Sequence, residues 1–238
     1  MRSVLQDKLE PDTIQWGHKL VTFSETNGNL VDSKGSVEMH FEVSEESSVN
    51  GNRVKRVQAS AELLVAADGV NSIVASTMYG AADYLGIFVI VGITPFLHPL
   101  LDERGFYTLD GEHRLFTMPF EGSAATDALL KRNGSSHSSR QTMWQLSFRL
   151  NKGKELEKLT MLSSEALLQE ALRRCDGWHE PVTKLLAATP SETVWGTGLR
   201  DRNPIDTYAF RKESNYFSRI LVLGDAKHAM SPFKGQGE

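Results

Sequence analysis

The sequence has a single cysteine, Cys175, so it cannot form an intramolecular disulfide. A lone cysteine is typical of a reducing compartment, and we expect a cytoplasmic protein. No apolar run approaches the roughly 20 residues that a transmembrane helix needs, and the first residues lack the apolar core of a secretory signal. No dense block of Lys and Arg occurs either, and the net charge is −4, so nucleic acid is not an expected partner.

A glycine-rich dinucleotide fingerprint, G-x-G-x-x-G opening a βαβ unit, is also absent. The nearest candidate, Gly196-Thr-Gly198, has no third glycine. Apolar residues make up 40% of the 238 residues and charged residues 24%, which is a globular composition rather than a disordered one. The chain is therefore long enough for a substantial core but lacks a recognisable dinucleotide-binding start.

The most informative stretch lies near the end of the chain. Residues 220–223 are four apolar residues that predict a buried strand, and Gly224-Asp225 follows them directly. Ligands of open α/β sheets gather at the carboxyl ends of the strands, where Asp225 could accept a hydrogen bond from a hydroxyl and Gly224 allows close approach. Pro232 stiffens the next turn. Residues 235–237, Gly-Gln-Gly, could then open a helix, whose N–H groups favour a partner that becomes negative.

A second strand has a similar ending. Residues 62–67 form a mostly apolar stretch that runs into Asp68-Gly69, and Ser72 can cap the turn that follows. An Asp-Gly pair after a strand is by itself an ordinary turn signal. Taken alone, the stretch therefore leaves a structural and a functional interpretation open.

Both stretches resemble motifs of the class A flavoprotein monooxygenases, the aromatic hydroxylase family. Residues 224–237 match its second FAD motif, GDAxHxxxPxxGQG, with Lys227 where the family more often has alanine. Residues 67–75 match its Asp-Gly motif, ADGxxSxVR, except that Ala75 replaces the closing arginine. Near the N-terminus, Arg2 begins an Arg-x-x-Leu-x-x-x-Leu pattern similar to a family helix whose arginine reaches the FAD.

The resemblance implies FAD and NAD(P)H as cofactors, and it implies a set of cofactor-binding residues. In the family, the aspartate of the second motif accepts a hydrogen bond from the ribityl chain of FAD, and the glycines after it face the pyrimidine side of the flavin ring. No catalytic side chain and no metal ligand is expected, because the flavin carries the reaction. The implied cofactor-binding residues are Gly224, Asp225, Pro232, Gly235, Gln236, Gly237, Asp68, Gly69 and Arg2.

The expected fold class is mixed α/β: a partial, Rossmann-like FAD-binding domain with a β-meander, plus an inserted, mainly β substrate domain. We assign residues 1–80 and 198–238 to the FAD-binding domain and 81–197 to the substrate domain. The predicted strands are 14–23, 37–43 and 53–60 in the meander, and 84–93, 105–109, 114–119, 141–150 and 191–197 in the insertion. The predicted helices after the N-terminal one begin at Ser163 and Pro181.

The implied function is an FAD-dependent, NAD(P)H-using monooxygenase that inserts one oxygen atom from O2 into an aromatic or electron-rich small molecule. In the family the missing fingerprint lies upstream, so we interpret the chain as a fragment that is inactive and retains FAD weakly or not at all by itself. Two alternatives stay open. One is a related flavin-dependent halogenase or reductase, although we find no lysine in a Trp-rich tunnel motif. The other is a non-catalytic remnant, which the departures at Ala75 and Lys227 favour.

Overall fold

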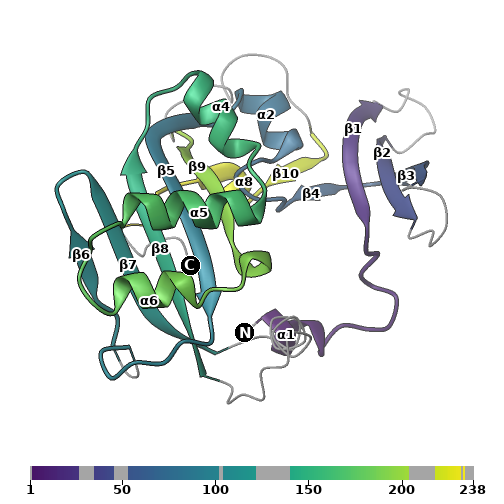
Figure 1. Cartoon of the computed structure of the whole chain (residues 1–238). Coiled ribbons are helices and arrows are strands. Elements are labelled where there is room, and N and C mark those ends of the chain that lie inside the picture. Colours follow the sequence, from purple (N-terminus) through teal and green to yellow (C-terminus); the bar gives the residue numbers. More distant parts are fainter. Residues whose placement is uncertain are drawn as a thin grey trace. The chain divides into compact units, whose positions relative to one another are not determined.

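Figure 1 shows the chain as a computed structural model, which describes residues 2–26, 35–45, 53–101, 104–121, 140–203, 218–231 and 233. The chain divides into two compact units: unit 1 comprises Met1–Asp83 and Asp201–Glu238, and unit 2 comprises Tyr84–Arg200. The fold is mixed α/β, with mostly sheet and few helices, as the sequence predicts. Among the described residues, no helix has the length and apolar character that a membrane crossing requires.

The predicted meander is present in unit 1. Strands β1 (His18–Thr26), β2 (Ser36–Glu45) and β3 (Arg53–Ala61) form one antiparallel sheet in that order. Strand β2 has one buried and one more exposed face, since Val37 is buried and His40 is exposed. The first strand starts later than predicted, at His18, because residues 16–17 form a turn in which Gly17 has a positive φ of 73°.

The remainder of unit 1 consists of short elements. Helix α1 (Arg2–Gln6) is the predicted N-terminal helix end. Strand β4 (Leu64–Ala66) leads into helix α2 (Ile73–Tyr79), and strand β10 (Ile220–Val222) leads into helix α8 (Asp225–His228). The two strands, α2 and α8 share one hydrophobic core with the meander, whose fully buried members include Val37, Val74, Ala75 and Ala226.

Unit 2 is built on a five-stranded sheet of order β6-β7-β8-β5-β9. The central antiparallel pair is β5 (Asp83–Thr94) and β8 (Arg140–Arg149). A hairpin turn at Asp110-Gly111 joins β6 (Tyr107–Leu109) to β7 (His113–Glu121), and β9 (Trp195–Asp201) lies beside β5. The Asp110 carboxylate closes the turn by accepting the backbone N–H groups of Glu112 and His113, at 2.9 and 2.6 Å.

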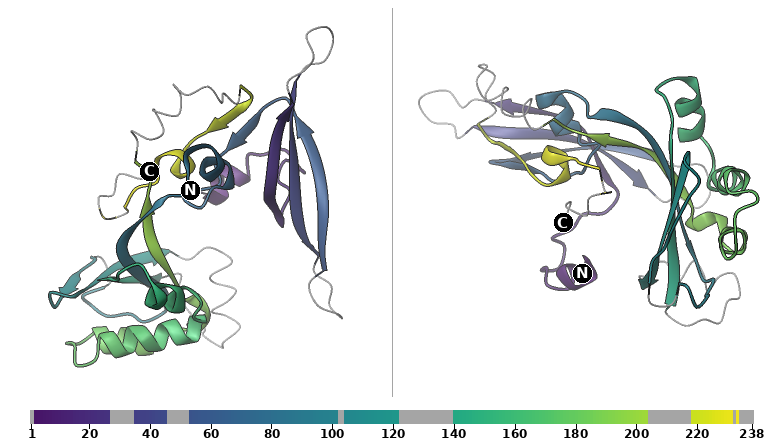
Figure 2. Two further views of the ribbon diagram at one scale, coloured as in Figure 1. Left: turned by 90° about the horizontal axis from the view of Figure 1, so that it is seen from above. Right: turned by 90° about the vertical axis from the view of Figure 1, so that its left-hand side faces the viewer.

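Helices cover one face of this sheet (Figure 2). They are α4 (Lys154–Thr160), α5 (Ser164–Arg174) and α6 (Val182–Ala187). Trp144 of β8 is fully buried in the core that they share, and its Nε1–H donates to Thr189 Oγ1 at 2.9 Å. The prediction of a strand from residue 191 is wrong at its start, because Ser191–Thr193 forms a 3₁₀ turn closed by hydrogen bonds to Pro190 and Ser191.

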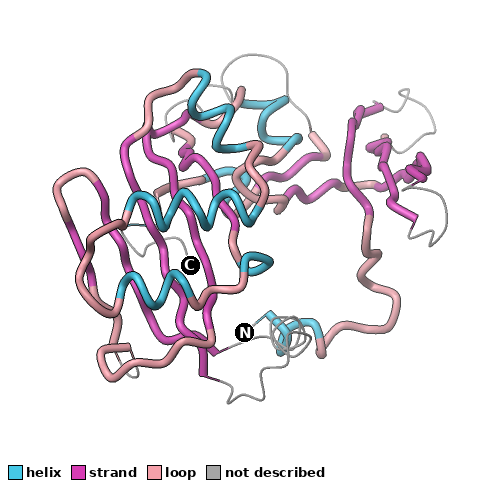
Figure 3. The backbone as a smooth tube through the Cα atoms, viewed as in Figure 1, coloured by secondary structure: helices cyan, strands magenta, loops and turns pink. Residues whose placement is uncertain are grey.

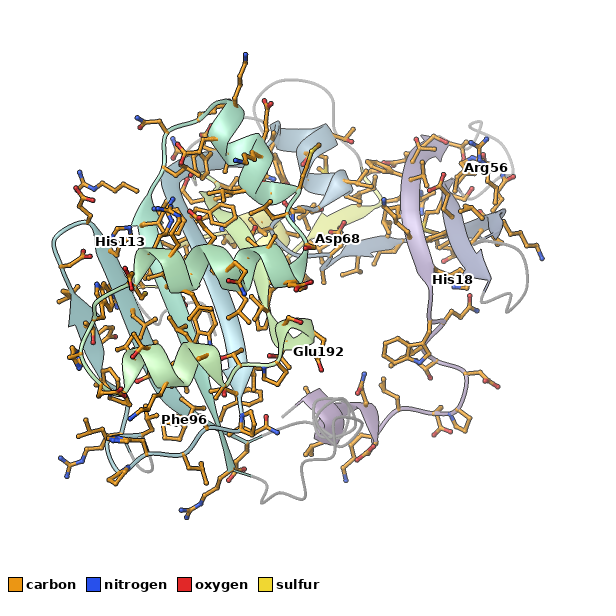
Figure 4. The ribbon with its side chains drawn as sticks, viewed as in Figure 1. His18, Arg56, Asp68, Phe96, His113 and Glu192 are labelled. Atoms are coloured by element: carbon orange, nitrogen blue, oxygen red, sulfur yellow. The ribbon has the colours of Figure 1, made fainter. Side chains whose placement is uncertain are left out.

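A charged cluster joins α5 to the sheet. Glu170 accepts hydrogen bonds from Arg173 Nε and Nη2 and from Arg174 Nε at 2.7–2.8 Å. Arg174 also lies 3.6 Å above the Phe148 ring and 3.2 Å from His113 Nε2, a residue labelled in Figure 4. Hydrogen bonding from Arg173 first, and then from Arg174, lowers the pKa of Glu170 below its usual range in spite of partial burial. The cluster therefore keeps Glu170 ionised under ordinary conditions.

The single cysteine follows this helix. Cys175 is fully buried in the core of unit 2 and caps the C-terminal end of α5. Burial raises the pKa of its thiol to about 12. A thiol that stays protonated is a poor nucleophile, so Cys175 acts as a packing residue.

Candidate functional site

Asp68 stands just after β4, at the start of the segment that leads into α2. Its Oδ2 accepts the backbone N–H of Ile73 at 3.2 Å. Ser72 caps the helix as predicted, since its Oγ accepts the N–H of Ala75 at 2.9 Å. The Asp68 side chain, labelled in Figure 4, is exposed. One carboxylate oxygen is thus fixed by the protein, while the other is accessible from solvent.

Asp225 has a similar place after β10. Gly224 turns the chain with a φ of 59°, and its carbonyl accepts the N–H groups of Lys227 and His228 at 3.0 and 2.9 Å. The sequence predicts a turn here, whereas the structure has the single helical turn α8, which begins at Asp225. Asp225 and His228 are both exposed, and His228 donates its backbone N–H to the Gly224 carbonyl.

The two aspartates belong to one sheet edge. Strands β4 and β10 pair in parallel, with Leu64 opposite Ile220 and Ala66 opposite Val222 (Figure 3). The N–H of Leu223 extends the pairing by donating to the carbonyl of Ala66 at 3.0 Å. Because parallel strands end at the same edge of a sheet, the segments that carry Asp68 and Asp225 leave the sheet side by side. The two strand ends that carry the motif aspartates therefore lie at one edge of the sheet.

The backbone around Gly69 and Gly224, the two glycines at this sheet edge, is accessible to a ligand. Gly69 has a φ of 79°, and a Cβ atom at Gly69 or at Gly224 would meet no atom of the described residues within 4 Å. A ligand can therefore approach both chain segments closely, and two exposed carboxylates are available to accept hydrogen bonds from hydroxyl groups. Positive φ at both positions also explains why glycine stands there.

Several predicted site residues cannot be placed. Pro232, Gly235, Gln236 and Gly237 lie outside the described residues. Arg2 begins helix α1, but its side chain is also outside the described part of the structure. The roles assigned to these residues stay predictions.

Ala75, which replaces the closing arginine of the family motif, fits into the core of its unit. Its side chain is fully buried within α2, in the core of unit 1. Position 75 therefore contributes a packing contact and no charge. Any contact that the family's arginine makes must be absent here or supplied by another residue.

Sequence reasoning missed one buried charged side chain in this unit. Arg202 is only 5% exposed, and its Nη1 donates to the carbonyl of Gly80, immediately after α2. The surrounding run Leu-Arg-Asp-Arg is dominated by charge, which predicts a solvated segment. Nothing in the local pattern signals burial, because the contacts of Arg202 come from residues far away along the chain.

A pocket of about 700 Å³ in unit 2 lies between α4 and α5, and half of its lining residues are charged, among them Glu155, Lys158 and Arg173. Its carboxylates differ from those of the sheet edge, because Glu170 is already paired with two arginines. Among the residues that the structure describes, no group of three or more His, Cys, Asp or Glu side chains is arranged to hold a metal ion. The edge carrying Asp68 and Asp225 is therefore the best candidate for a cofactor contact.

Known proteins provide an independent comparison. No family model matches the chain. Aurachin C monooxygenase/isomerase of Stigmatella aurantiaca is 40% identical over 68 residues, which are 29% of this chain and 16% of that protein. The chloroplastic zeaxanthin epoxidase of an Oncidium hybrid cultivar is 27% identical over 194 residues, which are 79% of this chain and 25% of that protein. The chain is homologous to FAD-dependent monooxygenases.

The fold of this monooxygenase homologue agrees with that relationship. The structure of Klebsiella pneumoniae HpxO in complex with FAD and uric acid matches it with a TM-score of 0.61 and 21% sequence identity. The match covers 99% of this chain and 49% of HpxO. The chain thus spans about half the length of this solved structure and a quarter or less of the two curated relatives.

Proposed function

We propose that this chain forms part of an FAD-dependent, NAD(P)H-using monooxygenase that inserts one oxygen atom from O2 into an aromatic or electron-rich small molecule. The observation that supports the proposal most is the parallel pairing of β4 and β10, which brings Asp68 and Asp225 to one sheet edge. Ligands of open α/β sheets bind at such edges.

The residues at this edge fit the polyhydroxylated part of FAD. Asp225 and Asp68 are exposed acceptors for ribityl or ribose hydroxyl groups, and Gly224 and Gly69 leave room for close approach. A hydrogen bond to a carboxylate is worth about 1.5–3 kcal/mol. When bound, FAD would supply the redox chemistry, accepting electrons from NAD(P)H and passing them to O2. The protein's own task is to bind and orient the cofactor.

The resemblance adds further contacts to this proposal. Residues 235–237 would direct backbone N–H groups toward the flavin ring, and Pro232 would lie near its reactive edge. Arg2 would complete the cofactor contacts from the N-terminal helix. No side chain of the chain is assigned as a catalytic acid or base.

The substrate is proposed to be a small organic molecule, since the related fold of HpxO was solved with uric acid. The net charge of −4 and the lack of a basic block speak against nucleic acid as a partner. A cytoplasmic location is proposed from the single cysteine, which needs no oxidising compartment.

The test is to express the chain together with any coding sequence that flanks it and to measure flavin content, NADPH oxidation and product mass under ¹⁸O2. Uric acid and zeaxanthin serve as the first substrate probes. We expect a yellow protein whose substrate-dependent NADPH oxidation is accompanied by incorporation of one ¹⁸O atom. A folded product that stays colourless with added FAD would contradict the proposal.

A pair of variants tests whether Asp225 contacts the bound FAD. We expect Asp225→Asn to weaken FAD binding by roughly 10- to 100-fold, the factor that corresponds to loss of one charge-assisted hydrogen bond. Asp83→Asn removes an exposed carboxylate elsewhere in unit 1 and is the matched control, which should bind FAD normally. Chlorinated products without ¹⁸O would favour a halogenase, and NADPH oxidation without oxygen transfer would favour a reductase.

A further inference from the structure

Arg202 is held between the ends of two short helices of unit 1. Its backbone N–H donates to the carbonyl of Ala229, the residue after α8, at 3.0 Å. Its side chain donates through Nη1 to the carbonyl of Gly80, the residue after α2. Arg202 is 5% exposed, so its guanidinium, held by the Gly80 carbonyl, lies in the interior of its unit, while the Ala229 carbonyl fixes its backbone.

The other donors of this guanidinium are not satisfied. Nε and Nη2 are buried, and neither has a hydrogen-bond partner within the described part of the chain. These two nitrogens form the side-on edge of an arginine, with parallel N–H groups spaced to match two oxygens of one carboxylate or phosphate group. The unsatisfied part of Arg202 is thus one complete bidentate edge rather than two unrelated atoms.

Burial makes this arrangement costly without a counterion. An arginine side chain stays charged at any ordinary pH, and a buried unpaired charge is strongly unfavourable. The carbonyls at the ends of α2 and α8 carry part of the negative end of each helix and orient the arginine. They engage only Nη1 and the backbone N–H, so the side-on edge still needs an acceptor. A bound ion is one of the established explanations for such buried donors.

We propose that Arg202 is an oxyanion-binding site, whose Nε–Nη2 edge takes two oxygens of a phosphate or carboxylate group carried by a small-molecule ligand. The proposed anion contact is distinct from the carboxylates of Asp68 and Asp225, since Asp68 precedes α2 and Asp225 begins α8, whereas Arg202 contacts the residues that follow both helices. Its chemistry is also opposite: the aspartates accept hydrogen bonds, whereas Arg202 donates to an anion. The proposal does not depend on FAD.

The test uses the 238-residue chain with inorganic phosphate and acetate as probes and chloride at equal ionic strength as the reference. Isothermal titration and thermal unfolding should show saturable binding of phosphate, acetate or both beyond the effect of chloride. The stronger probe identifies the group as a phosphate ester or a carboxylic acid. If neither probe exceeds chloride, the edge is satisfied within the chain and the proposal is wrong.

Two matched variants locate the binding. Arg202→Lys keeps the positive charge but removes the bidentate edge, and it should weaken binding of the preferred anion by about tenfold or more. Arg219→Lys is the control, because Arg219 is a half-buried arginine of the same unit whose Nη1 also donates to a backbone carbonyl, that of Glu62 at 3.3 Å. Unchanged binding in Arg202→Lys, or an equal loss in Arg219→Lys, would overturn the assignment.

A measurement on the unmodified chain covers the case in which Arg202→Lys does not fold. In ¹⁵N-labelled protein, one arginine Nε–H signal should shift as the anion is added, and its shift should follow the titrated affinity. If no arginine Nε–H signal responds while the anion binds, the anion lies elsewhere and Arg202 is not its site.

Discussion

Replacing Glu170 with glutamine should destabilise unit 2 at neutral pH, and the loss should disappear in acid. Arg173 is 66% exposed on its side chain, so its pair with Glu170 contributes little, about 0.2–1 kcal/mol. The pair with Arg174 is different, because the two side chains are only 13% and 17% exposed and their atoms are 2.7 Å apart. A hydrogen bond to a charged group in such a place is worth about 1.5–3 kcal/mol, so we expect a total loss of roughly 2–3 kcal/mol.

The pH dependence follows from the direction of the pKa shift. The pKa of Glu170 is lower in the folded chain than in the unfolded one, where it is near 4.5. Its contribution is therefore fully present above the unfolded pKa and is lost as pH falls through the folded pKa. The difference between wild type and Glu170→Gln should stay constant from pH 7 to about pH 5 and shrink below it.

The assay is urea unfolding of the full chain at several pH values, followed by tryptophan fluorescence. Trp144 is fully buried in unit 2 and reports on its core. Asp176→Asn is the control for the change in charge, since Asp176 is an exposed carboxylate after α5 that makes no ion pair among the described residues. A deficit of Glu170→Gln that persists unchanged at pH 3, or an equal deficit in Asp176→Asn, would refute the reasoning.

Two further substitutions test packing and capping. Gly92→Ala should destabilise unit 2 by about 1–3 kcal/mol, because the new Cβ would lie 2.5 Å from the ring of Trp144, which its hydrogen bond to Thr189 holds in place. The double variant Gly92→Ala/Trp144→Phe should show positive coupling in urea unfolding, and strict additivity would contradict the clash. Ser72→Ala should cost about 1 kcal/mol through loss of the helix cap on Ala75, whereas Ser72→Gly should cost only a few tenths; equal losses would argue against capping.

Much of the fold could be predicted because local pattern and tertiary structure agree. The alternation in residues 37–43 predicts a half-buried strand, and β2 has one buried and one exposed face. Ser163 begins a helix as its sequence context predicts, by capping α5 through the N–H of Ala166. The Asp-Gly turn of unit 2 is likewise local, since the Asp110 side chain closes it.

The sequence-based prediction fails where backbone conformation or contacts with distant residues determine the secondary structure. Helix α4 was not predicted, because Lys154–Thr160 carries few apolar residues at helical spacing. The 3₁₀ turn at Ser191–Thr193 has no distinctive sequence signal, and Thr193 is drawn inward by a hydrogen bond from its Oγ1 to the carbonyl of Ile93. Propensity alone cannot anticipate such long-range bonds.

The same distinction between local patterns and distant contacts applies to the candidate site. The Asp-Gly ending of residues 66–69 and the Gly-Asp ending of residues 222–225 could be found from sequence, because an apolar strand followed by Asp and Gly is a local pattern. That the two endings lie side by side was implied only by the resemblance, because neither segment contains a local pattern that predicts the pairing of β4 with β10. Arg202 could not be found at all, because its burial depends on Gly80 and Ala229 together.

The pairing of Leu64 with Ile220 also constrains the order of events during synthesis. Strand β4 emerges from the ribosome long before its partner, and the continuous stretch Tyr84–Arg200 emerges between them. Unit 2 can therefore finish folding before β10 has been synthesised. Until then, the edge of β4 that pairs with β10 is exposed. A chaperone that shields nascent β-edges would act on residues 64–66, and a ribosome-stalled chain ending before residue 218 should contain a protease-resistant unit 2 beside a digestible unit 1.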